Sequence, residues 1–274
     1  MRRRWPILAS LLVAVVNAAG CGDSSHPTVN PEAMLDAAAA HPIGSAQTEI
    51  DLRIDARGVP QLSGPVKLRL EGPYVSGGGT GIPSFDWKLS ASALGFPVGG
   101  RVVSTGTNAY LSLYADNYEV GPSAVAAANE RAGGIDLHPR AWFGPARIDG
   151  QGEEGGVDCE RISARLRMGA MARDLAPLAT SLGLSGPPTP SGRARACVGF
   201  DDRVLHELEV DAELGIPAAD RPSLGGASSI HLDLDVVISD VGQPQEISAP
   251  GGPYRPIRDL ALTLNDLGVP IPLG

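Results

Sequence analysis

The sequence has few of the residues from which catalytic and metal sites are built. Its 274 residues include only five histidines and three cysteines. No two histidines stand at helical i, i+4 spacing and none lies beside a cysteine, so no familiar zinc-binding pattern is present. The chain also lacks a Gly-x-Ser-x-Gly nucleophile turn, a phosphate-binding loop and a dinucleotide fingerprint. We therefore expect a protein that is not an enzyme and that uses no cofactor and no metal ion.

Positive charge and aromatic residues are also scarce. The only lysines are Lys67 and Lys88, and 22 basic residues face 31 acidic ones, which gives a net charge of −9. Nucleic-acid binding needs a basic surface, so we expect no nucleic-acid partner. Aromatic residues make up 4% of the chain. An interior would therefore be lined by aliphatic side chains, which suit flexible acyl chains better than flat rings or sugars.

No apolar run is long enough to be a membrane-spanning helix. The run from Trp5 to Val16 has about 12 residues and reaches about 18 Å as a helix, against roughly 30 Å of hydrocarbon. It follows three arginines and precedes the sequence Ala-Ala-Gly-Cys, which ends at Cys21. This pattern predicts a lipoprotein signal peptide over residues 1–20, with Cys21 receiving a diacylglyceryl group. The alternative is an ordinary secretory leader that is cut after Ala19 or Gly20.

Removal of this leader would leave an acidic protein held at the membrane by lipid. Without the three arginines, 19 basic residues face 31 acidic ones, a net charge of about −12. Such a body does not adhere to anionic lipid by charge, whereas two buried acyl chains are sufficient for stable anchoring. We expect residues 21–29 to form a lipidated flexible tether and residues 30–274 a single domain. The predicted location is the extracytoplasmic face of the cell membrane.

Two cysteines remain in the predicted mature chain. Cys159 and Cys197 are an even pair in an oxidising compartment, and both lie in segments that read as strands. A bridge that closes this loop of about 40 residues would contribute roughly 3–4 kcal/mol on the chain-entropy model. Free or metal-binding thiols are the alternative, but no histidine or third cysteine stands at ligand spacing. We predict a disulfide.

Most of the chain shows the period-two alternation of half-buried strands. We predict strands over residues 48–55, 65–71, 84–93, 101–104, 109–114, 118–120, 156–167, 193–200, 204–214 and 229–239. Helices are predicted over residues 32–40, 122–132, 168–182 and 257–267. Strands with one apolar and one polar face belong to an antiparallel sheet. The predicted fold is α+β: a single strongly curved antiparallel sheet, or half-barrel, with helices covering the concave face.

The apolar sides of three predicted strands are candidates for a ligand cavity. Their residues are Ile50, Leu52, Ile54, Val66, Leu68, Leu70, Phe85, Trp87 and Leu89. A dry aliphatic hollow would bind acyl chains at about 0.8 kcal/mol per buried methylene. The same rows also make an ordinary packed core, and the alternation pattern leaves the two interpretations open.

Two histidines lie in predicted strands, where they share a face with other named side chains. His206 shares a strand face with Leu208 and Val210, which predicts a hydrogen-bonded core histidine rather than a base. His231 alternates outward with Asp233 and Asp235, and together these three residues are a possible metal set. Three polar residues on one strand face more often form a solvated surface, which is the interpretation that we adopt.

The order of these features resembles the LppX/LprA/LprF/LprG family of actinobacterial envelope lipoproteins, which shares a half-barrel fold with LolA-type carriers. The resemblance covers most of residues 30–250, in a pattern of hydrophobicity and turns. It is carried by the lipobox, residues 63–68 (SGPVKL), 71–74 (EGPY), 82–87 (IPSFDW), 117–120 (NYEV), 232–240 (LDLDVVISD) and 243–247 (QPQEI). The cysteine pair and the Pro-rich segment 185–191 depart from the family pattern.

The resemblance implies a function in lipid binding. Members of the family are thought to hold acyl chains of lipids or glycolipids between the sheet and its helices. We therefore expect a membrane-anchored envelope lipoprotein that binds or carries acyl lipid or glycolipid without enzymatic activity. The alternative is a structural or protein-interaction lipoprotein of the same fold that has a filled core and no ligand.

Overall fold

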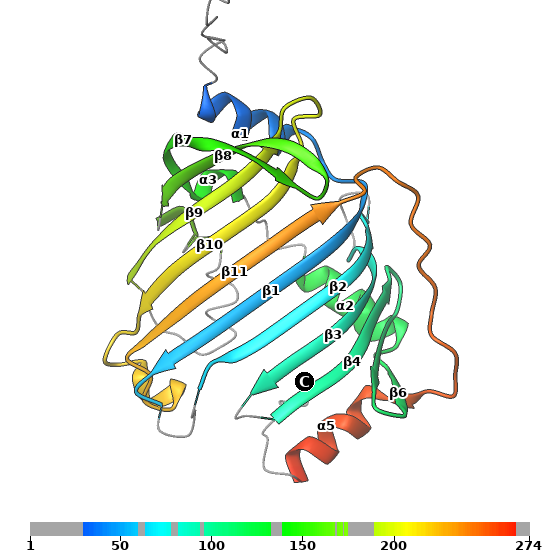
Figure 1. The fold of residues 1–274 in the computed structure, drawn as a ribbon. Helices are drawn as coiled ribbons and strands as arrows, with labels where there is room; N and C mark the ends of the chain where they lie inside the picture. Colours follow the sequence, from blue (N-terminus) through cyan, green and yellow to red (C-terminus); the bar gives the residue numbers. More distant parts are fainter. Residues whose placement is uncertain are drawn as a thin grey trace, which may run out of the picture.

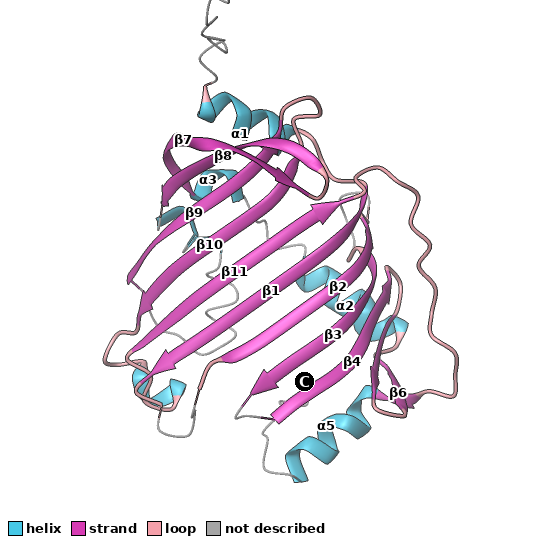
Figure 2. Cartoon of the chain, viewed as in Figure 1, coloured by secondary structure: helices cyan, strands magenta, loops and turns pink. Residues whose placement is uncertain are grey.

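The computed structural model describes residues 30–59, 64–77, 82–93, 96–132, 139–167, 169–171, 173–174 and 189–266. Strands dominate this part of the chain, and all of them belong to one open sheet (Figure 2). The first six strands are β1 (Ser45–Arg57), β2 (Val66–Val75), β3 (Ser84–Ala93), β4 (Phe96–Thr105), β5 (Ala109–Leu113) and β6 (Asp116–Glu119). The others are β7 (Phe143–Glu154), β8 (Val157–Leu166), β9 (Thr189–Gly199), β10 (Leu205–Gly215), β11 (Ser229–Ser239) and β12 (Arg255–Pro256).

Two antiparallel meanders make up the sheet, and one long-range strand pair joins them. The strand order is β12-β6-β5-β4-β3-β2-β1-β11-β10-β9-β8-β7. Strand β1 pairs antiparallel with the whole of β11, from Gln47 opposite Ser239 to Arg57 opposite Ser229 (Figure 1). Only the short β12–β6 pair is parallel. The predicted single, mostly antiparallel sheet is thus confirmed.

The structure has two strands that the alternation pattern does not predict. Strand β7 is an edge strand with Gly144, Pro145, Gly150 and Gly152, and its pairing with β8 contains two register shifts. Proline and glycine are tolerated at sheet edges and bulges, which is why this strand lacks a clear signal in the sequence. Strand β12 has only two residues and joins the sheet by pairing with β6.

Within the residues that the structure describes, the helices are few and short. They are α1 (Pro31–Ala40), α2 (Pro122–Ala132), α3 (Pro139–Trp142), the 3₁₀ turn η1 (Arg221–Leu224) and α5 (Ile257–Asp266). Asn30 caps α1 as predicted, because its side-chain oxygen accepts the backbone N–H groups of Glu32 and Ala33. Of the helix predicted over residues 168–182, only 169–171 and 173–174 are described, and these are helical.

Some predictions fall outside the described residues. The leader, Cys21 and the tether 21–29 precede Asn30, and segment 185–191 is described only from Thr189. Among the residues that are described, no helix has both the length and the apolar character needed to cross a membrane.

The predicted cover of helices is present over part of the sheet. Helices α2 and α3 lie on the same side of the sheet, behind it in the view of Figure 1. Helices α1 and α3 pack on the β7–β10 end, as the buried cluster described below shows. The described residues do not show helices that cover the whole of one concave face.

Candidate functional site

One face of the sheet is apolar from β2 to β8. The register places Leu68 opposite Leu52 and Leu52 opposite Leu234. The row continues through further cross-strand pairs, which are Leu234–Val210, Val210–Ala194 and Ala194–Ala164. Neighbouring strands lie about 4.8 Å apart, so this row across six strands is about 24 Å long. All nine predicted cavity residues lie on this face, because side chains alternate between the two faces along each strand and residues paired across strands share a face.

The β7–β10 end of this face is a packed core, which we call the packed half. Ile162 and Ala212 are fully buried, and Val210 is 2% exposed. Helices α1 and α3 and the helical residues 169–171 bring large side chains onto the strands. The buried cluster comprises Met34, Leu35, Trp142, Phe143, Ile162, Ala164, Leu166, Ala170, Met171, Ala194, Ala196, Val198, Val210 and Ala212.

Polar contacts fix α1 and α3 over this core. The Arg140 guanidinium on α3 pairs with Glu32 at 2.6 Å and with Asp36 at 2.7 Å, both on α1. The backbone N–H of Ala146 on β7 donates to the other Glu32 oxygen at 3.0 Å. This backbone hydrogen bond and the Arg140 pair outweigh partial burial and lower the pKa of the Glu32 carboxyl. Trp142 donates its indole N–H to Asp174 at 2.8 Å.

The β1–β4 and β11 end of the same face is less covered, and we call it the open half. Its half-buried apolar residues are Ile50, Leu52, Ile54, Val66, Leu68, Leu70, Phe85, Trp87 and Leu89, and Leu232 and Leu234 at its boundary also pack against the buried cluster. Helix α2 lies on this side of the sheet and is tied to the approach to β3, where the Ile82 N–H donates to Asn129 at 2.8 Å. Its sequence, PSAVAAANERA, contains Val125 as the only apolar side chain larger than alanine. Helix α2 therefore lacks the bulk to bury these rows.

Aromatic side chains gather at one end of the open half. The Phe85 and Trp87 rings stack, with centroids 4.0 Å apart and planes 12° from parallel. The Trp87 indole N–H donates to the Thr48 hydroxyl at 2.9 Å, and this hydroxyl donates to the Gly72 carbonyl at 3.0 Å. Gly72 has a φ of +148°, and a Cβ there would collide with the carbonyl oxygen of Asp86. Only glycine fits at this position in β2.

The opposite face of the sheet is charged and carries a hollow of about 630 Å³. Charged side chains from β1, β2, β9, β10 and β11 line it, with serines from β3. Most of its cations are paired, as in Arg195–Glu209 at 2.7 Å and Arg69–Asp51 at 2.9 Å. Asp235 has a buried oxygen that makes no hydrogen bond. Burial, reinforced by neighbouring carboxylates, raises the pKa of Asp235.

The His231 group lies on this charged face, as predicted. Its ring nitrogens lie 3.1 Å from an Asp233 oxygen and 3.5 Å from a Glu213 oxygen. The ligand atoms of Asp211, His231 and Asp233 lie within 4.8 Å of one another, so the group contains Asp211 in place of the predicted Asp235. Arg193 already pairs with Asp211 at 3.3 Å. These contacts favour an ion-paired surface over a metal site.

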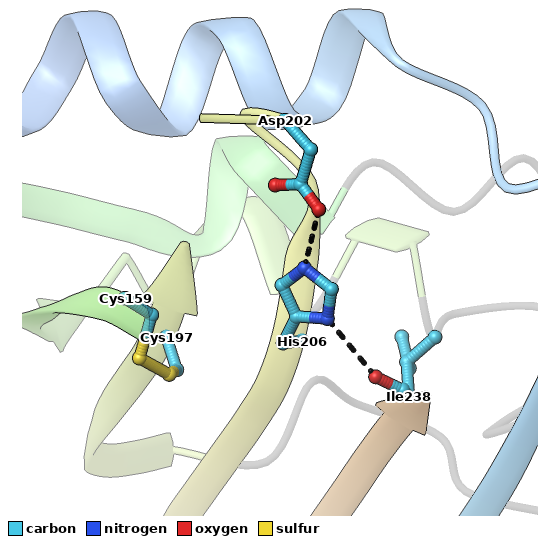
Figure 3. Close-up of a disulfide and its surroundings, with 5 residues drawn as sticks. All are labelled: Cys159, Cys197, Asp202, His206 and Ile238. Atoms are coloured by element: carbon cyan, nitrogen blue, oxygen red, sulfur yellow. Dashed lines mark hydrogen bonds and ion pairs between the residues drawn. A yellow bond between two sulfur atoms is a disulfide. The ribbon is translucent and has the colours of Figure 1, made fainter. Parts of the chain in front are cut away.

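His206 and the two cysteines lie at the β8–β10 end of the sheet (Figure 3), and the register places the cysteines on the face opposite the buried cluster. Cys159 and Cys197 form a disulfide between β8 and β9, with Cα atoms 5.5 Å apart and no exposed surface. His206 is 2% exposed and contacts Asp202 at 2.8 Å and the Ile238 carbonyl at 3.2 Å. It is the hydrogen-bonded core histidine that the sequence predicts. Among the described residues, neither His206 nor His231 is hydrogen-bonded to a serine, threonine or cysteine.

Sequence reasoning did not identify Thr48, Gly72 and Tyr74 as residues of the apolar face. Thr48 and Gly72 are opposite one another on β1 and β2, and Tyr74 is opposite Ala46. The signal was available in part, because Val66, Leu68 and Leu70 continue at period two through residues 72 and 74. The predicted strand ends at residue 71, so the prediction does not assign residues 72 and 74 to this face.

Comparison with known proteins gives similarity in structure alone. No family model and no curated protein matches the chain. Lipoprotein LppX of Mycobacterium tuberculosis is similar at 11% identity and a TM-score of 0.46, over 80% of this chain and 98% of that chain. LprF of Mycobacterium bovis gives 13% identity and a TM-score of 0.45, over 81% and 97%. A LolA superfamily protein of Nitrosomonas europaea gives 8% identity and a TM-score of 0.22, over 82% and 96%.

These similarities include LppX and LprF, two proteins of the family that the sequence resembles. The resemblance in sequence pattern is thus accompanied by a similarity in structure. At these identities and TM-scores, the structural similarity does not assign a function to this chain. A function has to be argued from the chain's own residues.

Proposed function

We propose that this chain is a non-enzymatic envelope lipoprotein that binds the acyl chains of a lipid or glycolipid on its open half. The observation that carries the proposal is the contrast in cover along one apolar face. Aliphatic rows on β1, β2, β3 and β11 are half-buried beneath a helix with small side chains. Burying ten methylenes against these rows would contribute about 8 kcal/mol. Flexible chains fit such a surface because they adapt to an aliphatic lining.

Anchoring by lipid at Cys21 is part of the same proposal. The Ala-Ala-Gly-Cys sequence supports it, together with the short apolar run that precedes it. Asn30, where α1 is capped, follows Cys21 by nine positions, so the tether would join the body beside the packed half. The acidic net charge supports a body held by acyl chains rather than by attraction to anionic headgroups. The protein would then act at the extracytoplasmic face of the membrane.

The second candidate is an interaction lipoprotein with no ligand. The packed half favours it, because there the same apolar face forms an ordinary core. The two functions differ in what the open half contains in solution. Bound lipid supports the first, and a protein without ligand supports the second.

Native mass spectrometry decides between these candidates. The protein would be purified from a bacterial envelope with Cys21→Ala, and again after incubation with vesicles of phosphatidylglycerol. We expect a stoichiometric acyl lipid on the protein. A mass without lipid in both preparations would contradict the proposal.

A matched pair of substitutions tests the assigned face. Leu68→Arg places a charge in the open half and should abolish lipid binding. Ser90→Arg places the same side chain on an exposed position of the charged face and should leave binding unchanged. Circular dichroism would verify that both variants fold. Lipid retained by a folded Leu68→Arg variant would show that the acyl chains bind elsewhere.

A further inference from the structure

Among the described residues of the open half, one polar side-chain group has no hydrogen-bond partner, and its position suggests how a ligand would lie there. The polar groups on the apolar face of β1–β4 are the hydroxyls of Thr48, Tyr74 and Ser104 and the indole N–H of Trp87. The Thr48 and Trp87 groups bond one another, and Ser104 donates to the Pro83 carbonyl at 2.8 Å. Within the described part of the chain, the Tyr74 hydroxyl makes no hydrogen bond and is not sealed from solvent.

The surroundings of Tyr74 are apolar. The register sets it between Ala46 on β1 and Phe85 on β3, and Phe85 stacks on Trp87. Ala46 is small and fully buried, so no large side chain stands on the β1 side of the ring. Burial raises the pKa of the Tyr74 hydroxyl, so it stays protonated and able to donate. A half-buried donor without a partner gains more from an acceptor than a solvated one does.

The rest of β2 offers a path for a chain that begins at Tyr74. Gly72 presents no side chain, and beyond it Leu70, Leu68 and Val66 form an aliphatic row. From Tyr74 to Val66 the strand runs about 26 Å. The aromatic end of the open half therefore places the Tyr74 hydroxyl, a hydrogen-bond donor, where the aliphatic row begins. Along Leu70–Val66 there is no side-chain donor without a partner.

We infer that the Tyr74 hydroxyl donates a hydrogen bond to an ester carbonyl of a bound acyl lipid and so fixes the direction in which the acyl chain lies along β2. The ester end lies beside Phe85 and Trp87, and the methyl end points toward Val66. This inference rests on the proposed function. It makes Tyr74 a specificity-determining residue for ester-linked over ether-linked lipid.

A matched pair of lipids tests this role. Diacyl phosphatidylglycerol and its dialkyl ether analogue share headgroup and chain length, but the ether lacks the carbonyl. The full-length protein with Cys21→Ala would be titrated with vesicles of each lipid, and occupancy read by native mass spectrometry. We expect the protein that retains Tyr74 to bind the ester lipid about 5-fold more tightly than the ether lipid, in line with one neutral hydrogen bond. Tyr74→Phe should remove this preference and leave ether-lipid binding unchanged.

Tyr114→Phe is the matched control, because Tyr114 is 87% exposed at the β5–β6 turn. It should keep the ester preference. Equal binding of both lipids by the protein that has Tyr74, or an ester preference that survives Tyr74→Phe, would overturn the inference. The first of these readings needs no substitution, so it stands even if Tyr74→Phe folds poorly. Failure of both lipids to bind would instead contradict the proposed function, and the inference would fall with it.

Discussion

The two halves of the apolar face have the same alternating pattern but different cover. In the packed half, Ile162 is fully buried and Trp142 is 8% exposed, beneath side chains from α1 and α3. In the open half, Ile54 and Trp87 remain half-buried, although they occupy equivalent places in long central strands. The strands alone therefore do not determine how completely such a face is buried.

The covering helices account for the difference. Helix α1 supplies Met34 and Leu35, and α3 supplies Trp142. Helix α2 has five alanines and Val125 as its only larger apolar residue. Side chains that reach the sheet expel water and pack, whereas alanines cover less of the apolar surface.

A loss of several kcal/mol is expected when the disulfide between β8 and β9, on the face opposite the packed half, is removed. The double substitution Cys159→Ala with Cys197→Ala should lower the free energy of unfolding by about 3–4 kcal/mol, because the bridge closes a loop of about 40 residues. Urea unfolding measures this change. Lipid binding by the open half should persist under native conditions. Thiols that react in the denatured, unreduced wild-type protein would contradict the bridge itself.

A matched pair of isoleucines compares the halves directly. Ile162→Ala removes a fully buried side chain and should cost about 2–5 kcal/mol of unfolding free energy. Ile54→Ala removes the same atoms from a half-buried position and should cost less than about 2 kcal/mol. Chemical denaturation without lipid gives both values. Equal losses would show that the open half is packed as tightly as the other.

Added lipid should enlarge the stability difference between wild type and Ile54→Ala. A ligand stabilises the folded state in proportion to its affinity, and Ile54→Ala would lose contacts to the acyl chains. Ile162→Ala should gain as much stability from lipid as wild type does. A lipid-dependent gain that is equal in all three proteins would place the binding site away from β1.

The smallest change in stability is expected on the charged face, which lies on the other side of the sheet from both halves. Burial and neighbouring acids raise the pKa of Asp235, so its ionised form destabilises the fold. This cost is absent below the unfolded pKa near 3.9 and complete above the folded pKa. Asp235→Asn should therefore raise stability at pH 7 by less than about 1 kcal/mol, with no gain below about pH 4. Unfolding curves across this range test it, and a pH-independent gain would refute the assignment.

Local features of this structure could be predicted from the sequence. The β11 bounds, the Asn30 cap, α2 and the burial of His206 all follow from alternation, capping chemistry and short-range pattern. The pairing of Cys159 with Cys197 also followed, because only two cysteines remained once Cys21 was set aside. These features depend on residues that are close in sequence or few in number.

The remaining features depend on contacts between distant segments. The β1–β11 pair joins residues that are nearly 200 positions apart, and nothing in either strand specifies its partner. Strand β7 is held at the edge by β8 despite its glycines and proline. The hollow on the charged face and the unpartnered Tyr74 hydroxyl exist only once the register is set. Alternation predicted which side chains share a face but not what covers that face.

Trp87 and Trp142, the two tryptophans that follow the predicted leader, give the most direct test of the open half as the lipid site. Protein that lacks residues 1–20 and carries Cys21→Ala would be prepared with Trp142→Phe, which leaves Trp87, and with Trp87→Phe, which leaves Trp142. Each would be titrated with phosphatidylglycerol whose acyl chains carry bromine, a contact quencher of indole fluorescence. We predict strong quenching of Trp87 and almost none of Trp142. Equal quenching of both, or quenching of neither, would contradict the assignment of acyl chains to the open half.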